Sequence, residues 1–161
     1  MSSESDGFED FHWMFDMLHH IDVGLVVLNA DYEVHLWNSF MENHSGISSS
    51  IAKGQELLAL FPTIDPNWFR QKLDNVLKLK TPIFISWEQH SNTFPFKSYR
   101  PITGIADKMY QNVMIRPVSS PDGTIKQLCL VVYDVTDIAV NKRALSTANS
   151  RLQRLASALS K

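Results

Sequence analysis

The feature that most constrains the fold is a strand that runs directly into a long helix in the last third of the chain. Residues 125–133 read IKQLCLVVY, an apolar and β-branched run, and 134–137 (DVTD) follow with no loop residues between. Beyond them, mostly apolar residues recur every seven positions in two series offset by three. The first series is Ile138, Leu145, Leu152 and Leu159, and the second is Ala148 and Leu155 after the polar Asn141. This heptad pattern predicts a coiled coil in a parallel homodimer.

Asn141 stands within the predicted seam, where a polar residue fixes the register and favours a dimer at some cost in stability. The alternative is a single amphipathic helix that folds back on its own sheet. A domain whose final strand leads into a coiled coil is suited to pass a conformational signal onward. Because the sequence ends inside this helix, we interpret the chain as the input half of a longer protein.

Composition excludes several classes of protein. The 161 residues are 44% hydrophobic, enough for one domain with appendages, and the net charge of -2 comes without a basic run. We therefore expect no nucleic-acid partner. The first ten residues are polar and acidic, and no apolar run approaches a membrane span, which predicts a cytoplasmic fragment without membrane contact. The single Cys129 excludes an intrachain disulfide and is expected to fill core space.

Periodicity and turn residues divide the chain into helices and strands. The predicted helices are 8–20, 39–44, 48–52, 55–60 and 65–80, and the predicted strands are 23–28, 32–37, 83–89, 109–116 and 125–133. Asp65-Pro66 marks a helix start, because Asp caps free amides and Pro needs no amide partner at the first position.

This order predicts an α+β fold with one five-stranded antiparallel sheet, flanking short helices, an N-terminal helix and a C-terminal signalling helix. The expected parts are an amphipathic cap helix at 1–21, a domain at 22–137 and a coiled-coil linker at 138–161. The first and last strands are apolar on both faces, so both faces need cover. The short helices can cover one face. The cap helix or a second subunit is expected to cover the other face.

The motifs together resemble the PAS family of sensory domains over about residues 22–137. The matching features are VGLVVL at 23–28, Trp37-Asn38 before a short helix, GQELLALFP at 54–62, the helix from Asp65, and three closing strands that end in Asp134-Val135-Thr136. The resemblance implies a sensory and dimerisation module that responds to a ligand or to redox state. In that family the Asp caps the outgoing helix, so Asp134 and Thr136 are the expected signal exit.

Two segments bear on what the module does. The connection 91–108 is long for the PAS family, and we expect a surface insertion, a lid over the pocket or a dimer contact. Residues 148–157 (ANSRLQRLAS) resemble the helix that precedes GGDEF diguanylate cyclase domains. The resemblance favours a diguanylate cyclase as the output domain, and a histidine kinase is the alternative.

A small-molecule pocket between sheet and helices is the expected ligand site. The candidate lining residues are Trp37, Phe40, Leu57, Phe61, Trp68, Phe69, Trp87, Gln89, Tyr110, Asn112 and Met114. Gln89 and Asn112 would supply hydrogen bonds. The alternative is that these side chains simply pack a core, with the amides outward, because a one-residue error in strand phase reverses every side chain. A ligand-free dimerisation module therefore stays open beside a sensor.

Catalytic and cofactor motifs are absent from the sequence. No phosphate-binding loop, nucleophile elbow or Cys-rich metal pattern occurs, so we expect the chain itself not to be an enzyme. His12, Asp16 and His20 share one side of the first helix, which indicates a solvated face rather than a metal site. The cofactor is unknown; the resemblance disfavours haem, because helix 65–80 lacks a histidine, and flavin photochemistry, because Cys129 lies in the last strand.

Overall fold

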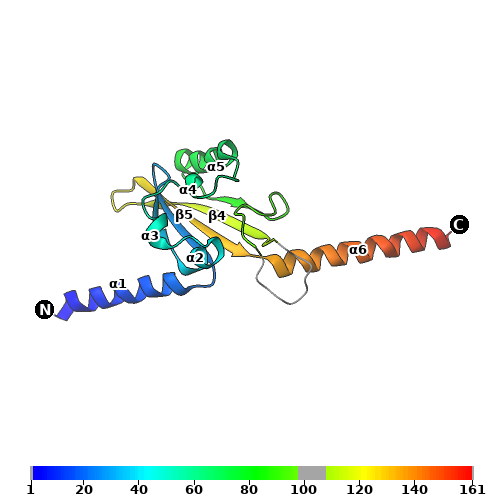
Figure 1. Cartoon of the computed structure of the whole chain (residues 1–161), viewed down its shortest axis with the longest axis horizontal. Helices are drawn as coiled ribbons and strands as arrows, with labels where there is room; N and C mark the ends of the chain where they lie inside the picture. The colour runs from blue at the N-terminus through cyan, green and yellow to red at the C-terminus, as the bar shows by residue number, and fades with distance from the viewer. Residues whose placement is uncertain (1, 98–107, 161) are drawn as a thin grey trace.

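The chain folds into one antiparallel sheet that carries short helices on one face and a long helix at each end (Figure 1). The computed structural model describes residues 2–97 and 108–160. Its elements are α1 (Ser2–His20), β1 (Gly24–Asn29), β2 (Val34–Trp37), α2 (Ser39–Ser45), α3 (Ser49–Ala52), α4 (Leu57–Leu60), α5 (Pro66–Leu79), β3 (Ile83–Ile85), β4 (Gln111–Ser119), β5 (Ile125–Asp134) and α6 (Thr136–Leu159). The predicted α+β class and five-stranded sheet are confirmed.

The last strand lies at the centre of the sheet. The strand order is β2-β1-β5-β4-β3, and each neighbouring pair is antiparallel. β5 pairs with all of β1 on one side and with β4 from Gln111 to Ser119 on the other. The strand that leads into α6 is therefore bonded to the strands on both sides, and a change in either neighbour reaches it directly.

The hydrophobic core lies between this sheet and helices α2–α5. Alternate residues of β1, β4 and β5 point into it, among them Val26, Val113 and Leu130. Gly24 allows the closest approach, because a Cβ there would stand 2.7 Å from Met41 Sδ and 2.8 Å from Val132 Cβ. Only glycine lets α2 pack this tightly on β1 and β5.

Asn38 is a fully buried polar residue that joins three elements. Its Oδ1 accepts hydrogen bonds from Leu25 N at 3.0 Å and from Met41 N at 3.3 Å. Its Nδ2 donates to Val23 O at 2.7 Å and to Leu18 O at 3.4 Å. One side chain therefore caps α2, holds the start of β1 and fixes the last turn of α1.

β3 is shorter than the sequence predicts. It ends at Ile85, and residues 87–89 form a turn in which Gln89 N and His90 N both donate to Ser86 O, at 3.2 and 3.0 Å. The predicted strand 83–89 is wrong in its second half. Aromatic and β-branched residues favour a strand, but the local turn bonds prevail after Ile85.

The N-terminal helix does not cover the open face of the sheet, so of the two covers expected for that face the second subunit stays a prediction. α1 leaves the domain beside the β2 edge and extends away from it (Figure 1). Its large apolar side chains remain exposed, Phe11 by 69% and Trp13 by 65%. On the open face of the sheet, Phe84 and Tyr133 are also exposed. Both surfaces are available to a second subunit.

α6 extends from the opposite end of the domain and does not fold back on the sheet (Figure 1). Thr136 and Ala139 are buried at its start, and every described residue from Asn141 onward is exposed. The fold-back alternative therefore does not describe this structure. Within residues 2–97 and 108–160, no helix is long and apolar enough to cross a membrane.

Candidate functional site

The interior between the sheet and helices α2–α5, where the sequence predicts a ligand pocket, is occupied by side chains. Five of the predicted lining residues are buried in the hydrophobic core: Trp37, Phe40, Leu57, Phe61 and Phe69. The Trp37 and Phe61 rings stack with their centroids 6.0 Å apart. Their part in binding a ligand stays a prediction.

Two more aromatic side chains enter this interior from the connection between β3 and β4. Phe94 is fully buried and Phe96 nearly so. Their rings stack at 5.6 Å, and Phe94 meets Phe61 edge-to-face at 5.2 Å. Residues 91–97 therefore supply part of the core rather than a surface insertion. The rest of the expected lid or dimer contact, at 98–107, lies outside the described residues.

Gln111 holds the Phe94 segment against the sheet. The buried Gln111 amide accepts a hydrogen bond from Phe94 N at 2.8 Å and donates one to Phe94 O at 3.0 Å. Asn92 Nδ2 adds a bond to Met109 O at 2.8 Å. A side-chain amide thus satisfies backbone groups that have no strand partner. Sequence analysis missed Gln111, although its alternation with Val113 and Ile115 was a usable signal.

The predicted facing of β4 is wrong by one residue. Tyr110, Asn112 and Met114 are half-buried and alternate with the core residues, so the strand turns their side chains away from the interior. Gln89 is exposed in its turn and faces away from the interior. Trp68 is half-buried, packs against the edge of the core and stacks on His90 with ring centroids 4.4 Å apart.

Trp87 and Tyr110 form a different site, at the start of α6. Their rings meet edge-to-face at 5.8 Å, and Trp87 N donates to Asn112 Oδ1 at 2.9 Å. Lys142 lies 5.9 Å from the Trp87 ring and pairs with Glu88. Arg143 lies 5.0 Å from the Tyr110 ring and donates to its hydroxyl. We call these five residues the α6 clamp: Trp87, Glu88, Tyr110, Lys142 and Arg143.

The predicted signal exit is a bonded junction between β5, β4 and α6. Asp134 Oδ1 accepts from Thr136 N at 3.0 Å and from Thr136 Oγ1 at 2.6 Å. Tyr110 N donates to Thr136 Oγ1 at 3.1 Å, and Val135 N donates to Tyr110 O at 2.9 Å. Asp134 thus binds an amide of the first turn from the position before the N-cap residue Val135.

The heptad residues of α6 form one continuous exposed stripe. The stripe consists of Ile138, Asn141, Leu145, Ala148, Leu152, Leu155 and Leu159, all of them exposed. Leu145 and Leu152 each expose 63% of their surface. A row of exposed leucines on a helix that projects from the domain is typical of a coiled-coil helix without its partner.

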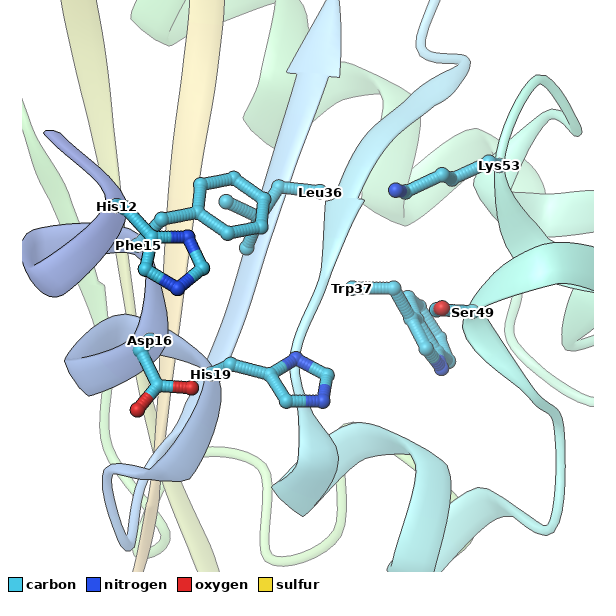
Figure 2. A pocket seen from close by; sticks show the side chains of 8 residues that line it. All are labelled: His12, Phe15, Asp16, His19, Leu36, Trp37, Ser49 and Lys53. Carbon is cyan, nitrogen blue, oxygen red and sulfur yellow. The ribbon is translucent and has the colours of Figure 1, made fainter. Parts of the chain in front are cut away.

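A separate pocket lies outside the core, between α1, β2 and α3 (Figure 2). Its volume is about 280 Å³, and α1 contributes four of its lining side chains. The lining residues are His12, Phe15, Asp16, His19, Leu36, Trp37, Ser49 and Lys53. No sequence pattern indicates this pocket, because it depends on where α1 lies relative to β2.

Within 2–97 and 108–160, no three His, Cys, Asp or Glu side chains are placed to hold a metal ion. His12 and Asp16 line the pocket, while Asp16 pairs with His20 at 3.5 Å along the helix. Burial raises the pKa of the Cys129 thiol, which makes it a poor nucleophile.

Comparisons with known proteins agree with this fold. The PAS fold family matches residues 18–139, so the chain belongs to that family, whose members are sensory domains of signalling proteins. No curated protein matches the chain.

Several solved structures share the fold. A sensory box sensor histidine kinase from Vibrio cholerae is 28% identical, with a TM-score of 0.57, over 84% of this chain and 98% of that one. The PAS domain of Bordetella pertussis BvgS is 14% identical, with a TM-score of 0.58, over 89% and 98%. A PAS domain from Colwellia psychrerythraea is 13% identical, with a TM-score of 0.58, over 79% and 98%.

Proposed function

We propose that the chain is a non-catalytic sensory and dimerisation module that relays ligand or redox state through α6 to an output domain. The observation that carries this proposal is the junction, where β5 enters α6 with no loop and Thr136 is bonded to both Asp134 and Tyr110. A cytoplasmic location stays a prediction from the sequence.

The relay requires two arrangements of α6 with different affinity for the signal. A shift of β4 relative to β5 would move Tyr110, which bonds Thr136 and also contacts Arg143 in the α6 clamp. The same strand shift would therefore reach α6 at two points, seven residues apart. The result would be a rotation of α6 or a change in its register against a partner helix.

The partner in this proposal is a second copy of the chain, bound in parallel through the α6 stripe. Asn141 faces Asn141 in a parallel pair, so it would select the dimer and the register. The exposed apolar faces of α1 and of the sheet are further surfaces that the second copy could cover. The buried stripe would stabilise the dimer mainly through its leucines.

Sedimentation equilibrium of the whole chain tests the dimer. We expect a dimer at micromolar concentration and a monomer, or at least about a tenfold weaker dimer, for Leu152→Glu, because a charge in the seam opposes pairing. Ser150→Glu, on the opposite side of α6, is the matched control and should leave the dimer intact. A monomeric wild-type chain, or equal effects of both variants, would exclude the coiled coil.

For the output domain we propose a diguanylate cyclase, supported by the resemblance of residues 148–157 to the helix that precedes GGDEF domains. The similarity to the Vibrio cholerae histidine kinase supports the alternative. Assays of the full-length protein separate the two, since one output condenses GTP into cyclic di-GMP and the other transfers phosphate from ATP to histidine.

A ligand-free dimerisation module is the second candidate, favoured by the Phe94 and Phe96 rings that occupy the interior. Native mass spectrometry of the purified domain compares its mass with the denatured mass. Retained extra mass would support a ligand in the domain. A dimer that carries no extra mass would favour the module without a tightly bound ligand.

A further inference from the structure

The pocket between α1, β2 and α3 lies outside the filled interior of the domain. Its volume of about 280 Å³ is near the lower limit for small-molecule sites, which typically span about 300–1,000 Å³. Figure 2 shows α1 on one side of the pocket and Lys53, directly after α3, on the other. A small ligand there would contact the N-terminal helix and the domain at once.

Apolar side chains form the middle of the pocket. Phe15 comes from α1, and Leu36 and Trp37 come from β2. The Trp37 indole N–H already donates to Ile47 O at 3.0 Å, so Trp37 offers a ligand only apolar surface. Phe15 still exposes 51% of its surface and therefore has area left to bury. This wall suits a small hydrocarbon or aromatic group.

The backbone of Lys53 is fixed beside β2. Lys53 N donates to Ser49 O at 3.0 Å, and the next amide, Gly54 N, donates to Val34 O at 2.8 Å. Gly54 takes a φ of 79°, a left-handed conformation that favours glycine. The side chain of Lys53 therefore starts from a defined position at the rim of the pocket.

The free positive charge of the pocket lies at one end of the apolar wall. Lys53 forms no ion pair or hydrogen bond through its side chain with any residue in 2–97 and 108–160, and its ammonium points toward the pocket (Figure 2). Ser49 lines the same side with a hydroxyl. Asp16 stands on the α1 side, where it pairs with His20 at 3.5 Å. The negative charge is thus apart from Lys53 and already has a partner.

We propose that this pocket binds a small monocarboxylate with one apolar group, such as an aryl-substituted short-chain acid. Its carboxylate would lie at Lys53 and Ser49, and its apolar group against Phe15 and Leu36. The molecule has its charge at one end and its hydrocarbon beyond, in the order that the pocket presents them. A bare anion would leave the apolar wall unused, and an amine would be repelled by Lys53.

The apolar contact would supply most of the affinity, and the charge would supply the selectivity. Lys53 is exposed, and an ion pair in contact with water contributes only about 1 kcal/mol at most. We therefore expect about a fivefold preference for a carboxylate over its neutral amide, rather than a preference of several orders of magnitude.

Binding there would fix the direction of α1. The last turn of α1 is already held, since Leu18 O accepts from Asn38 and His19 O from Ser39. Phe15 lies in the turn before it, and a ligand would hold that turn against β2 and α3. The exposed apolar face of α1 would then take one orientation. This regulatory meaning rests on the proposed sensory function, whereas the binding itself does not.

Isothermal titration of the whole chain with three probes tests the proposal. The probes are 3-phenylpropanoate, 3-phenylpropanamide, which lacks the charge, and acetate, which lacks the apolar group. We expect saturable binding of 3-phenylpropanoate with a dissociation constant below about 1 mM, about fivefold tighter than the amide and far tighter than acetate. Equal binding of the amide would overturn the role of the charge, and equal binding of acetate would overturn the apolar contact. No saturable binding of 3-phenylpropanoate would overturn the site.

Substitutions on the two sides of the pocket locate the binding. Lys53→Met should abolish the preference for 3-phenylpropanoate over the amide, whereas Lys78→Met on α5, with the same change of charge, should keep it. Phe15→Ala should weaken both probes about fivefold through lost apolar contact, whereas Phe11→Ala, which alters an α1 ring outside the lining, should not.

A preference that survives Lys53→Met, or equal effects of the two phenylalanine variants, would place the binding elsewhere and overturn the assignment. Dimerisation is measured separately by sedimentation, so loss of this site would leave the proposed function standing.

Discussion

At the residue scale, the interior depends on a few polar side chains that replace missing backbone partners. Gln111 and Asn38 are both fully buried, and each bonds two or more backbone groups of other segments. Buried polar groups cost free energy unless they are paired, so both positions tolerate few other residues. Gln111 holds the segment around Phe94, and Asn38 holds the last turn of α1; no strand or helix hydrogen bonds would hold either one.

Replacing Gln111 by leucine should destabilise the domain by about 3 kcal/mol, because the buried N–H and C=O of Phe94 would both lose their partner. Urea unfolding followed by tryptophan fluorescence measures the loss. Gln127→Leu, on the other face of the sheet, is the matched control and should change stability by no more than about 0.5 kcal/mol. Similar losses for the two variants would show that Gln111 does not hold the segment.

His44 should make stability depend on pH. Burial lowers the pKa of its imidazole, although Asp134 and Asp22 oppose that effect, and its ring lies 4.2 Å from Phe40. Because the folded-state pKa is lower than the unfolded one, the unfolded chain binds more protons between the two values. The free energy of unfolding should therefore fall as pH falls below about 6.5.

Unfolding by urea between pH 8 and pH 5 measures this dependence. His44→Gln should flatten the profile, since glutamine does not titrate, whereas His35→Gln, on the exposed side of β2, should leave it unchanged. A His44→Gln profile as steep as that of the wild type would assign the pH dependence to other groups.

At the scale of elements, the start of α6 is held from two sides. The junction bonds it to β5 and to Tyr110. In the α6 clamp, Lys142 then contacts the turn after β3, and Arg143 contacts Tyr110 before β4. Beyond the clamp, every described side chain of α6 is exposed. The clamp therefore decides how firmly the direction of α6 follows the sheet.

Removing both cations of the clamp should loosen the first turns of α6. The variant Lys142→Gln/Arg143→Gln loses an exposed ion pair and two cation–π contacts, worth together about 1.5 kcal/mol. Hydrogen exchange of the α6 amides at 137–143, read by mass spectrometry, should then be about tenfold faster. Arg151→Gln, far along the helix, is the control, and unchanged exchange in the double variant would show that the clamp contributes nothing.

At the scale of the whole molecule, the sequence predicted the order of elements, the sheet and the exit into α6, because each depends on local periodicity. The predicted facing of β4 was wrong for a physical reason. In residues 109–116, each of the two alternating sets of side chains contains one amide and otherwise mainly apolar residues, so hydrophobicity alone does not show which set is buried. Arg116, which is exposed, shares a face with Asn112 and was the informative residue.

The remaining differences arise from contacts between distant segments. Phe94 and Phe96 follow no strand or helix pattern, so nothing local shows that they enter the core. The direction of α1 depends on bonds from Asn38 and Ser39 to its last turn, which no periodicity reveals. The pocket at α1 was missed for the same reason, since its two sides are about 40 residues apart in the chain.

Because no loop separates β5 from α6, the number of residues at this connection determines the direction in which the leucine stripe of α6 faces. Each helical residue adds about 100° and 1.5 Å, so one residue inserted after Thr136 would turn the leucine stripe by more than a quarter of a circle. Seven residues return it to within about 20°. Under the proposed relay, we therefore expect the output of a fusion to a new effector to rise and fall with the number of inserted residues, with a period of seven.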